Sequence, residues 1–240
     1  MTAAAFTLLA AILPLVPTVP ARAQDGSLAG ATLIKRGPTG CHAVAFTFDL
    51  CPVRDPIGFD APLVELLREH HIPATFFASG RWIERHDRAV RELLGVPFFE
   101  VETHGQLHRH LPALDRAAQQ AEIEGPFHLL HATYGYSATL FRPPYGEYDQ
   151  TTRELASADG LGLVLWSAVS GDPSPRISSE QMLRALRATV RDGSIIIFHA
   201  NGRGHHTREV VETLHAELDR AGLRSLTVKD LLAGCTVGPS

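Results

Sequence analysis

The chain has 240 residues, and its 26 acidic side chains outnumber 22 basic ones, which gives a formal net charge of −4 at pH 7. That length suffices for one domain with a substantial buried core. The mild negative charge, without a basic patch, argues against nucleic acid and other polyanions as partners.

The first 23 residues have the composition of a secretory signal peptide. Residues 3–19 are almost wholly apolar, contain Pro14 and Pro17, and precede the sequence Ala21-Arg22-Ala23. An apolar stretch before an A-x-A site is typical of a cleaved leader, and this one is short for a membrane span. We therefore expect an exported domain, residues 24–240, that is periplasmic or secreted and has no stable membrane anchor.

Three cysteines are present, at Cys41, Cys51 and Cys235. Export permits disulfides, but an odd number leaves at least one thiol unpaired or paired elsewhere. A Cys41–Cys235 bridge would tie the first strand to the C-terminal tail. No Cys-x-x-Cys pair occurs, so a structural zinc site rich in sulfur is not expected.

Apolar segments rich in β-formers alternate with segments of helical period. Asp60 is placed to cap a helix over 61–70, Ser178 with Gln181 forms a capping-box pattern, and residues 207–221 have an apolar stripe. Residues 112–133 are also helical in character, and Gly125-Pro126 is expected to break them in two. The strand-like segments are 43–48, 72–78, 97–101, 139–142, 161–166, 194–199 and 224–228.

This alternation predicts an α/β fold with about seven parallel strands and crossover helices. No Gly-x-Gly-x-x-Gly follows the first strand, so a dinucleotide-binding unit is disfavoured. A distorted, closed or nearly closed (β/α) barrel fits better, and in such barrels the active groups lie at the C-terminal ends of the strands.

Polar residues of complementary chemistry stand at the ends of three predicted strands. Asp49 follows the apolar run 44–48, and Arg142 and His199 end two later strands. A guanidinium beside Asp49 would lower the pKa of that carboxyl and hold it through a bidentate contact. His199 could protonate a leaving group near neutral pH. These residue types indicate acid–base catalysis.

A further pair of residues has the spacing of metal ligands. His104 and His108 are four residues apart, which would place both imidazoles on one face of a helical turn. Neutral imidazole suits zinc and neighbouring transition metals better than calcium or magnesium. The later turn Pro143-Pro144-Tyr145-Gly146 is stiff enough to aim backbone N–H groups at an oxyanion.

Five segments resemble, in chain order, the motifs of polysaccharide deacetylases, the NodB-homology domain also called carbohydrate esterase family four. The resemblance covers about residues 43–230 and implies a distorted (β/α) barrel. It also implies removal of N-acetyl, sometimes O-acetyl, groups from sugars with a divalent metal, usually zinc. The segments are Thr47-Phe48-Asp49, His104-x-x-x-His108, Arg142-Pro143-Pro144-Tyr145-Gly146, Trp166 with Asp172, and Ile197-Phe198-His199.

The resemblance assigns catalytic roles to four of these residues. Asp49 would be the general base, taking a proton from a metal-bound water that attacks the acetyl carbonyl, and Arg142 would orient it. His199 would be the general acid, with Asp172 holding its ring and raising its pKa.

The remaining matched residues would hold the metal and the substrate. His104 and His108 would be the metal ligands. The backbone N–H of Tyr145, in the turn with Pro144, would bind the oxyanion, and Trp166 would line the acetyl pocket.

One position departs from the family pattern. The first motif usually has two consecutive acids, of which the second binds the metal, and here that second position is Leu50. Asp55 or Cys51 could supply the missing ligand, and otherwise water would fill the gap. Asp60 is a further candidate, but its role as a helix cap is the stronger interpretation.

We therefore predict an exported, metal-dependent hydrolase of N-acetylated amino-sugar polymers or oligomers, such as chitooligosaccharide, peptidoglycan or exopolysaccharide. Leu50 motivates one alternative, a barrel that binds glycan without catalysis. An esterase acting on O-acetylated polysaccharide is the other.

Overall fold

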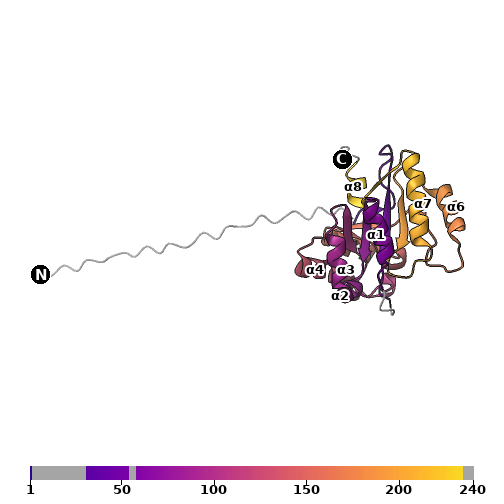
Figure 1. Ribbon diagram of the computed structural model, residues 1–240. Helices are drawn as coiled ribbons and strands as arrows, with labels where there is room; N and C mark the ends of the chain where they lie inside the picture. Colours follow the sequence, from indigo (N-terminus) through magenta and orange to yellow (C-terminus); the bar gives the residue numbers. More distant parts are fainter. Residues whose placement is uncertain (2–30, 54–57, 235–240) are drawn as a thin grey trace.

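The computed structural model describes residues 1, 31–53 and 58–234 (Figure 1). Its strands are β1 Leu33–Ile34, β2 Ala43–Leu50, β3 Ala74–Ala78, β4 Phe99–Thr103, β5 Leu140–Phe141, β6 Gly162–Val164, β7 Ala168–Val169, β8 Ile195–His199 and β9 Arg224–Leu226. Its α-helices are α1 Ala61–Glu69, α2 Gly80–Arg85, α3 Asp87–Leu94, α4 Arg116–Tyr134, α5 Gln150–Ala158, α6 Ser179–Thr189, α7 Thr207–Arg220 and α8 Val228–Leu232, with short 3-10 turns η1 Leu111–Ala113 and η2 Pro144–Gly146.

The strands form one parallel sheet in the order β1-β6-β5-β4-β3-β2-β8-β7, and β9 also pairs with β2. The sheet curls into a half-barrel, which confirms the predicted (β/α) architecture. Strands β1 and β7 were not predicted, because two residues are too few to show a period. All parallel strands present their C-terminal ends at the same edge, so residues 49, 103 and 199 lie together there.

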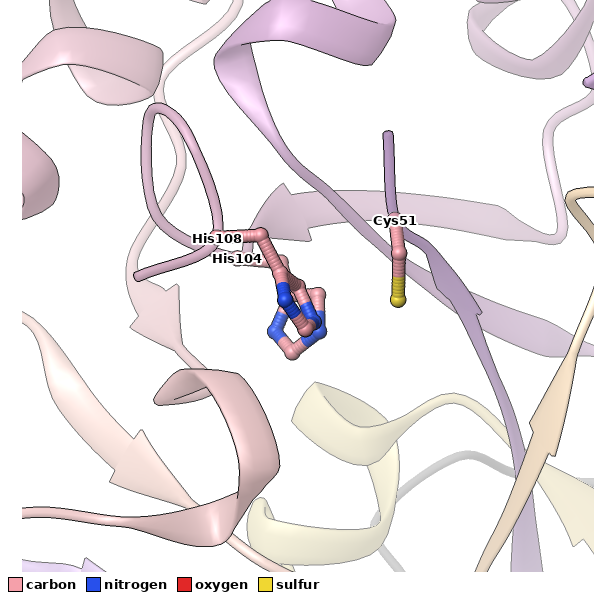
Figure 2. Close-up of side chains that lie close together, drawn as sticks. All are labelled: Cys51, His104 and His108. Atoms are coloured by element: carbon pink, nitrogen blue, oxygen red, sulfur yellow. The ribbon is translucent and has the colours of Figure 1, made fainter. Parts of the chain in front are cut away.

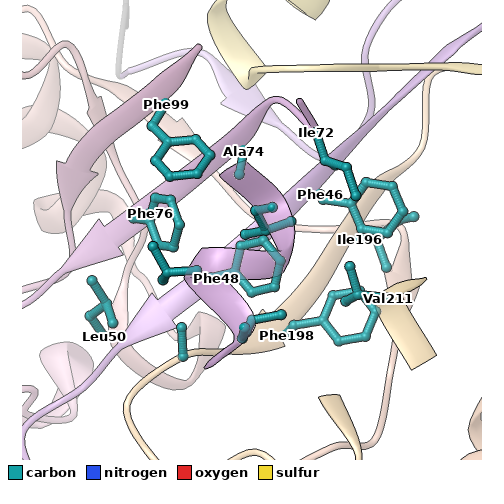
Figure 3. Packing of buried hydrophobic residues seen from close by; sticks show 14 of the residues in the cluster. Phe46, Phe48, Leu50, Ile72, Ala74, Phe76, Phe99, Ile196, Phe198 and Val211 are labelled. Carbon is teal, nitrogen blue, oxygen red and sulfur yellow. The ribbon is translucent and has the colours of Figure 1, made fainter. Parts of the chain in front are cut away.

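Alternate residues of β2 face two different layers. Phe46, Phe48 and Leu50 pack into a large cluster between the sheet and the helices, with Phe48 stacked between Phe76 and Phe198 (Figure 3). Figure 1 shows α1 and α7 covering this side, next to each other. Ala43 and Ala45 belong to a second cluster inside the curl. Because side chains of a strand alternate, the pleat turns Asp49 inward and Leu50 outward.

Three predicted helices are confirmed, two of them by their caps. Asp60 accepts a hydrogen bond from Leu63 N at 3.1 Å at the start of α1. Ser178 and Gln181 form the expected capping box at the start of α6. Helix α7 begins at Thr207 and buries the expected apolar stripe.

The predicted break at Gly125-Pro126 is wrong, because α4 runs unbroken from Arg116 to Tyr134. Proline removes one backbone hydrogen bond, but Ile123, Pro126 and Leu130 are buried together along the helix. Tertiary packing therefore compensates for the local defect. Gly125 also lets the helix approach the loop after β4, since a Cβ there would meet Gln106 Oε1 at 2.5 Å.

Cys41 is disulfide-bonded, and Cys235, its expected partner, lies outside the described residues, as do Asp55 and residues 2–23 of the predicted leader. Cys51 is a free, buried thiol. No helix within the described residues is long and apolar enough to cross a membrane.

Candidate functional site

A pocket of about 330 Å³ opens at the C-terminal edge of the sheet. It brings together most of the residues that were singled out from the sequence, although they are up to 150 positions apart. It also contains residues without an assigned role, among them Arg203 and Val169. The pocket is lined by Asp49, Cys51, His104, His108, Tyr145, Trp166, Val169, Ser170, Gly171, Asp172, Pro173, Ile197, His199 and Arg203.

Asp49 and Arg142 form a buried ion pair on the floor of the pocket. Arg142 Nη1 donates to Asp49 Oδ1 at 2.7 Å, whereas Nη2 donates to the Leu165 carbonyl at 3.3 Å. The contact is therefore single rather than bidentate, and the guanidinium lies over the Phe77 ring. Burial alone would raise the pKa of Asp49, but electrostatic interactions with His104, Arg142 and His199 hold it below its usual value.

His104 presents a lone pair to the pocket. Its Nδ1 lies 2.8 Å from the Arg142 carbonyl oxygen, to which it can only donate, so the neutral ring carries its proton on Nδ1. Burial lowers the pKa of His104 and favours this neutral form. Its Nε2 is buried and has no hydrogen-bond partner among the described residues. An orphaned acceptor in a polar pocket is the arrangement expected of a metal ligand.

His108 reaches the same place by a loop rather than by the predicted helical turn. Residues 104–110 are not helical, and both Gly105 and His108 have positive φ, at 74° and 63°. The His104 and His108 rings lie 4.8 Å apart between centroids. Burial, with the charge of His104, lowers the pKa of His108 to about 3, so this imidazole is also neutral.

Glu122 holds this loop in shape and was not recognised from the sequence. Its carboxylate accepts hydrogen bonds from the backbone N–H groups of Leu107, at 3.0 Å, and Arg109, at 3.4 Å. The signal for it was an acid on the buried face of α4, next to Ile123. An acid in such a position needs partners, and a loop with free N–H groups supplies them.

Among the described residues, Cys51 is the third-ligand candidate that lies beside the two histidines. The ligand atoms of Cys51, His104 and His108 all lie within 4.8 Å of one another (Figure 2). Asp60 is engaged as a helix cap, Leu50 points into the outer core, and Asp55 lies outside the described residues. The strand period offered a signal for Cys51, because positions 49 and 51 share a face.

His199 and Asp172 form a second acid–base pair on the other side of the pocket. His199 Nδ1 lies 2.9 Å from Asp172 Oδ1, and Asp172 Oδ2 accepts from the His199 backbone N–H and the Thr207 hydroxyl. Burial disfavours the charged imidazole, but the hydrogen bond and charge of Asp172 outweigh it and raise the pKa of His199. The ring is thus held with Nε2 free to carry a second proton near neutral pH.

Tyr145 and Trp166 form the wall nearest to solvent. Tyr145 has φ 60°, a strained value for a residue with a side chain, and its ring is 52% exposed. The His110 ring stacks on it, with the centroids 4.0 Å apart. The close packing of Trp166 explains the glycine at position 146, where a Cβ would lie 2.8 Å from the indole.

Pro144, which was predicted with Tyr145 as part of the substrate-binding turn, is not among the residues that line the pocket. It is buried, and its ring packs against Gly105, at which a Cβ would lie 3.0 Å from Pro144 Cγ. Its role is therefore to support the loop that carries His104 and His108.

Comparison with known proteins identifies the family of this chain. The family model described as Polysaccharide deacetylase matches residues 36–164, more than half of the chain, and the chain belongs to this family. A chitooligosaccharide deacetylase of Sinorhizobium fredii is 30% identical over 167 residues, which are 69% of this chain and 75% of that protein.

Solved structures share the fold at lower identity. A peptidoglycan N-acetylglucosamine deacetylase superposes with a TM-score of 0.77 at 23% identity, covering 85% of this chain and 94% of that one. A pseudoenzyme of the same family from Bacillus anthracis gives a TM-score of 0.76 at 21% identity, covering 84% of this chain and 69% of that one. The family thus includes proteins without activity, so the chemistry of this chain must be argued from its own site.

Proposed function

We propose that this chain is an exported, metal-dependent hydrolase that removes N-acetyl groups from amino-sugar polymers or oligomers. The observation that carries the proposal is the pairing of an ionised, buried Asp49 with a protonatable His199 across one pocket. Amide hydrolysis needs a base to activate water and an acid to release the amine, and these residues supply both.

The chain's own residues support a divalent metal between base and acid. His104 and His108 are neutral and line the pocket, and their ligand nitrogens lie within 4.8 Å of each other. The Nε2 of His104 has no hydrogen-bond partner among the described residues, and it lies 3.5 Å from Asp49 Oδ2. Imidazole nitrogen favours zinc. When bound, a zinc ion would acidify water and polarise the acetyl carbonyl.

Each protein group then has a defined task. Asp49, oriented by Arg142, accepts the proton of the attacking water. The backbone N–H of Tyr145 binds the developing oxyanion, a contact typically worth about 2.7–4 kcal/mol. His199, whose ring Asp172 orients, protonates the departing nitrogen, because without that proton the nitrogen would have to leave as an amide anion, a very poor leaving group. Trp166 closes the acetyl pocket.

The pocket rim supports a carbohydrate substrate. Tyr145 and Val169 are exposed apolar side chains that both line the opening. Such surfaces suit the apolar face of a sugar ring, while the polar floor fixes the orientation of the acetyl group. The similarity to a chitooligosaccharide deacetylase points to the same substrate class.

Two features support action outside the cytoplasm: the leader-like residues 1–23 and the disulfide-bonded Cys41. The second candidate function is glycan binding without catalysis. Leu50, which replaces the family's metal-binding acid, favours it, and the intact Asp49, Arg142 and His199 oppose it.

The test is acetate release from N-acetylglucosamine oligomers by the purified protein, after chelation and after zinc is added back. We expect release to disappear with the chelator and return with zinc. Peptidoglycan and acetylated xylan, assayed in parallel, identify a different substrate or an O-acetyl esterase. If none of the three releases acetate with any metal but the oligomers bind, the deacetylase proposal fails and the binding function replaces it.

A further inference from the structure

We propose that Cys51 is the third protein ligand of the metal, which makes this a cysteine–histidine–histidine site. The inference rests on the proposed metal-dependent function and extends it to the ligand set and the metal preference. The family's second acid would stand at Leu50, one residue earlier, so the ligand has both moved along the chain and changed its chemistry.

The pleat of β2 decides which residue can reach the metal. Leu50 is fully buried in the outer cluster with Phe48 and Phe76, and its side chain points away from the pocket (Figure 3). Cys51 follows directly and turns back to the side of Asp49, with its sulfur facing the two imidazoles (Figure 2). A ligand on this strand end therefore has to come from position 51 rather than 50.

The spacing of the three ligand atoms suits a metal ion. They lie within 4.8 Å of one another. Zinc bonds of about 2.0–2.1 Å to nitrogen and about 2.3 Å to sulfur put tetrahedral ligand atoms roughly 3.3–3.6 Å apart. The two ligand atoms that are farthest apart would have to approach each other by roughly 1 Å when a metal binds. Rotation of the side chains can supply this shift.

Hydrogen bonds to side chains of other segments fix the backbone at Cys51. Its carbonyl accepts a hydrogen bond from Asn201 Nδ2 at 3.0 Å, and Asn201 is itself buried. The Leu50 carbonyl accepts from both the backbone N–H and the hydroxyl of Ser79. Asn201 is thus a positioning residue, since it anchors the ligand from the neighbouring strand end.

Two observations separate Cys51 from an ordinary core cysteine. Although it is only 3% exposed, it belongs to none of the three hydrophobic clusters found among the described residues. In addition, the Nε2 of His104 is buried beside it, aimed into the same space, with no hydrogen-bond partner in the described part of the chain. A buried lone pair and a buried thiol that face one point are explained by a shared metal.

A thiolate ligand changes which metal is bound. Soft sulfur favours zinc over manganese and magnesium, which prefer carboxylate oxygen. Replacing the family's carboxylate by Cys51 therefore predicts a site that is more selective for zinc. Cys51→Asp should restore an oxygen ligand and shift the preference back toward manganese.

The test is zinc X-ray absorption spectroscopy on the purified, zinc-loaded protein. We expect one sulfur neighbour at about 2.3 Å in addition to nitrogen neighbours at about 2.0–2.1 Å. The sulfur signal should vanish in Cys51→Ser and Cys51→Asp. Loss of an outer-shell partner alone costs about 10–100-fold in affinity, so Cys51→Ser should weaken zinc binding at least that much. Cobalt-loaded protein should show thiolate-to-metal charge-transfer absorption that Cys51→Ser lacks.

Asp60→Asn is the matched control, because Asp60 was the competing acid and asparagine still caps a helix. It should leave the sulfur signal and the zinc affinity unchanged. Bound zinc without a sulfur neighbour, or with one that survives in Cys51→Ser, overturns the inference. Zinc-dependent acetate release without sulfur would leave the proposed function standing, whereas a sulfur-bound zinc without acetate release would overturn only that function. A protein that binds no zinc overturns both.

Discussion

The curled sheet buries carboxylates on two of its strands, and nearby cations compensate their charges to different degrees. On β2, Asp49 has one fully buried cation, Arg142, which donates to it directly. On β4, Glu100 and Glu102 lie two residues apart and share one partially exposed lysine, Lys229 of α8. Figure 1 shows α8 at the opposite end of the molecule from α2, which follows the C-terminal end of β3.

The pKa values of these acids differ because the number of nearby cations per carboxylate differs. Asp49 is surrounded by positive groups that outweigh the effect of burial, so its pKa is lowered. Burial and the charge of Glu100 instead raise the pKa of Glu102 to about 8, which the lysine only partly counteracts. Burial alone therefore does not decide the charge of an acid, because nearby cations can outweigh its effect, as they do at Asp49.

Substitution of Asp49 should have the largest effect. Asp49→Asn removes the charge but keeps the shape, so acetate release should fall by about 10²–10⁴-fold, the usual contribution of a general base. Circular dichroism and zinc content should stay close to those of the wild type, since His104 and His108 remain. If the variant retained most of its activity, another group would have to be the base.

Asp172→Asn tests the role of Asp172, the second carboxylate of the pocket, which pairs with His199. The charge of Asp172 raises the pKa of His199, so its loss should lower that pKa and move the alkaline limb of the kcat/KM profile to lower pH. We expect roughly a 10–100-fold loss of rate at neutral pH. Ser170→Ala removes one donor to Asp172 but keeps the charge, and its pH profile should not move.

Glu102→Gln tests the buried acid of β4, and we expect it to have the smallest effect of the three substitutions. A carboxyl whose pKa is higher in the folded protein than in the unfolded chain contributes stability at low pH that is lost as the pH rises. Between about pH 4.5 and pH 8, the free energy of unfolding should therefore fall less in the variant than in the wild type, by roughly 1–3 kcal/mol.

Denaturant titrations of both proteins at pH 5 and pH 8 measure this difference. Acetate release should change less than in Asp49→Asn and Asp172→Asn, because Glu102 does not line the pocket. An equal pH dependence in the two proteins would show that Glu102 titrates normally.

Much of the fold was readable from the sequence because its signals are local. Helix caps join residues three positions apart, as at Asp60 and Ser178, and they were predicted at the right places. Strand periods and abrupt polar ends identified β2 and β8, together with Asp49 and His199. Most of the motif residues follow the strands of one sheet, and the order of the motifs along the chain indicated the family.

Other features depended on contacts between distant segments, which local patterns do not contain. Helix α4 continues through Pro126 because its buried face packs against the sheet, and the 104–110 loop keeps its shape because Glu122 reaches it from that helix. The closeness of Cys51 to the two histidines was likewise visible only in three dimensions. A strand period places 49 and 51 on one face, but only the folded sheet shows that this face meets His104 and His108. Sequence determines which groups are available, and packing determines which of them share a pocket.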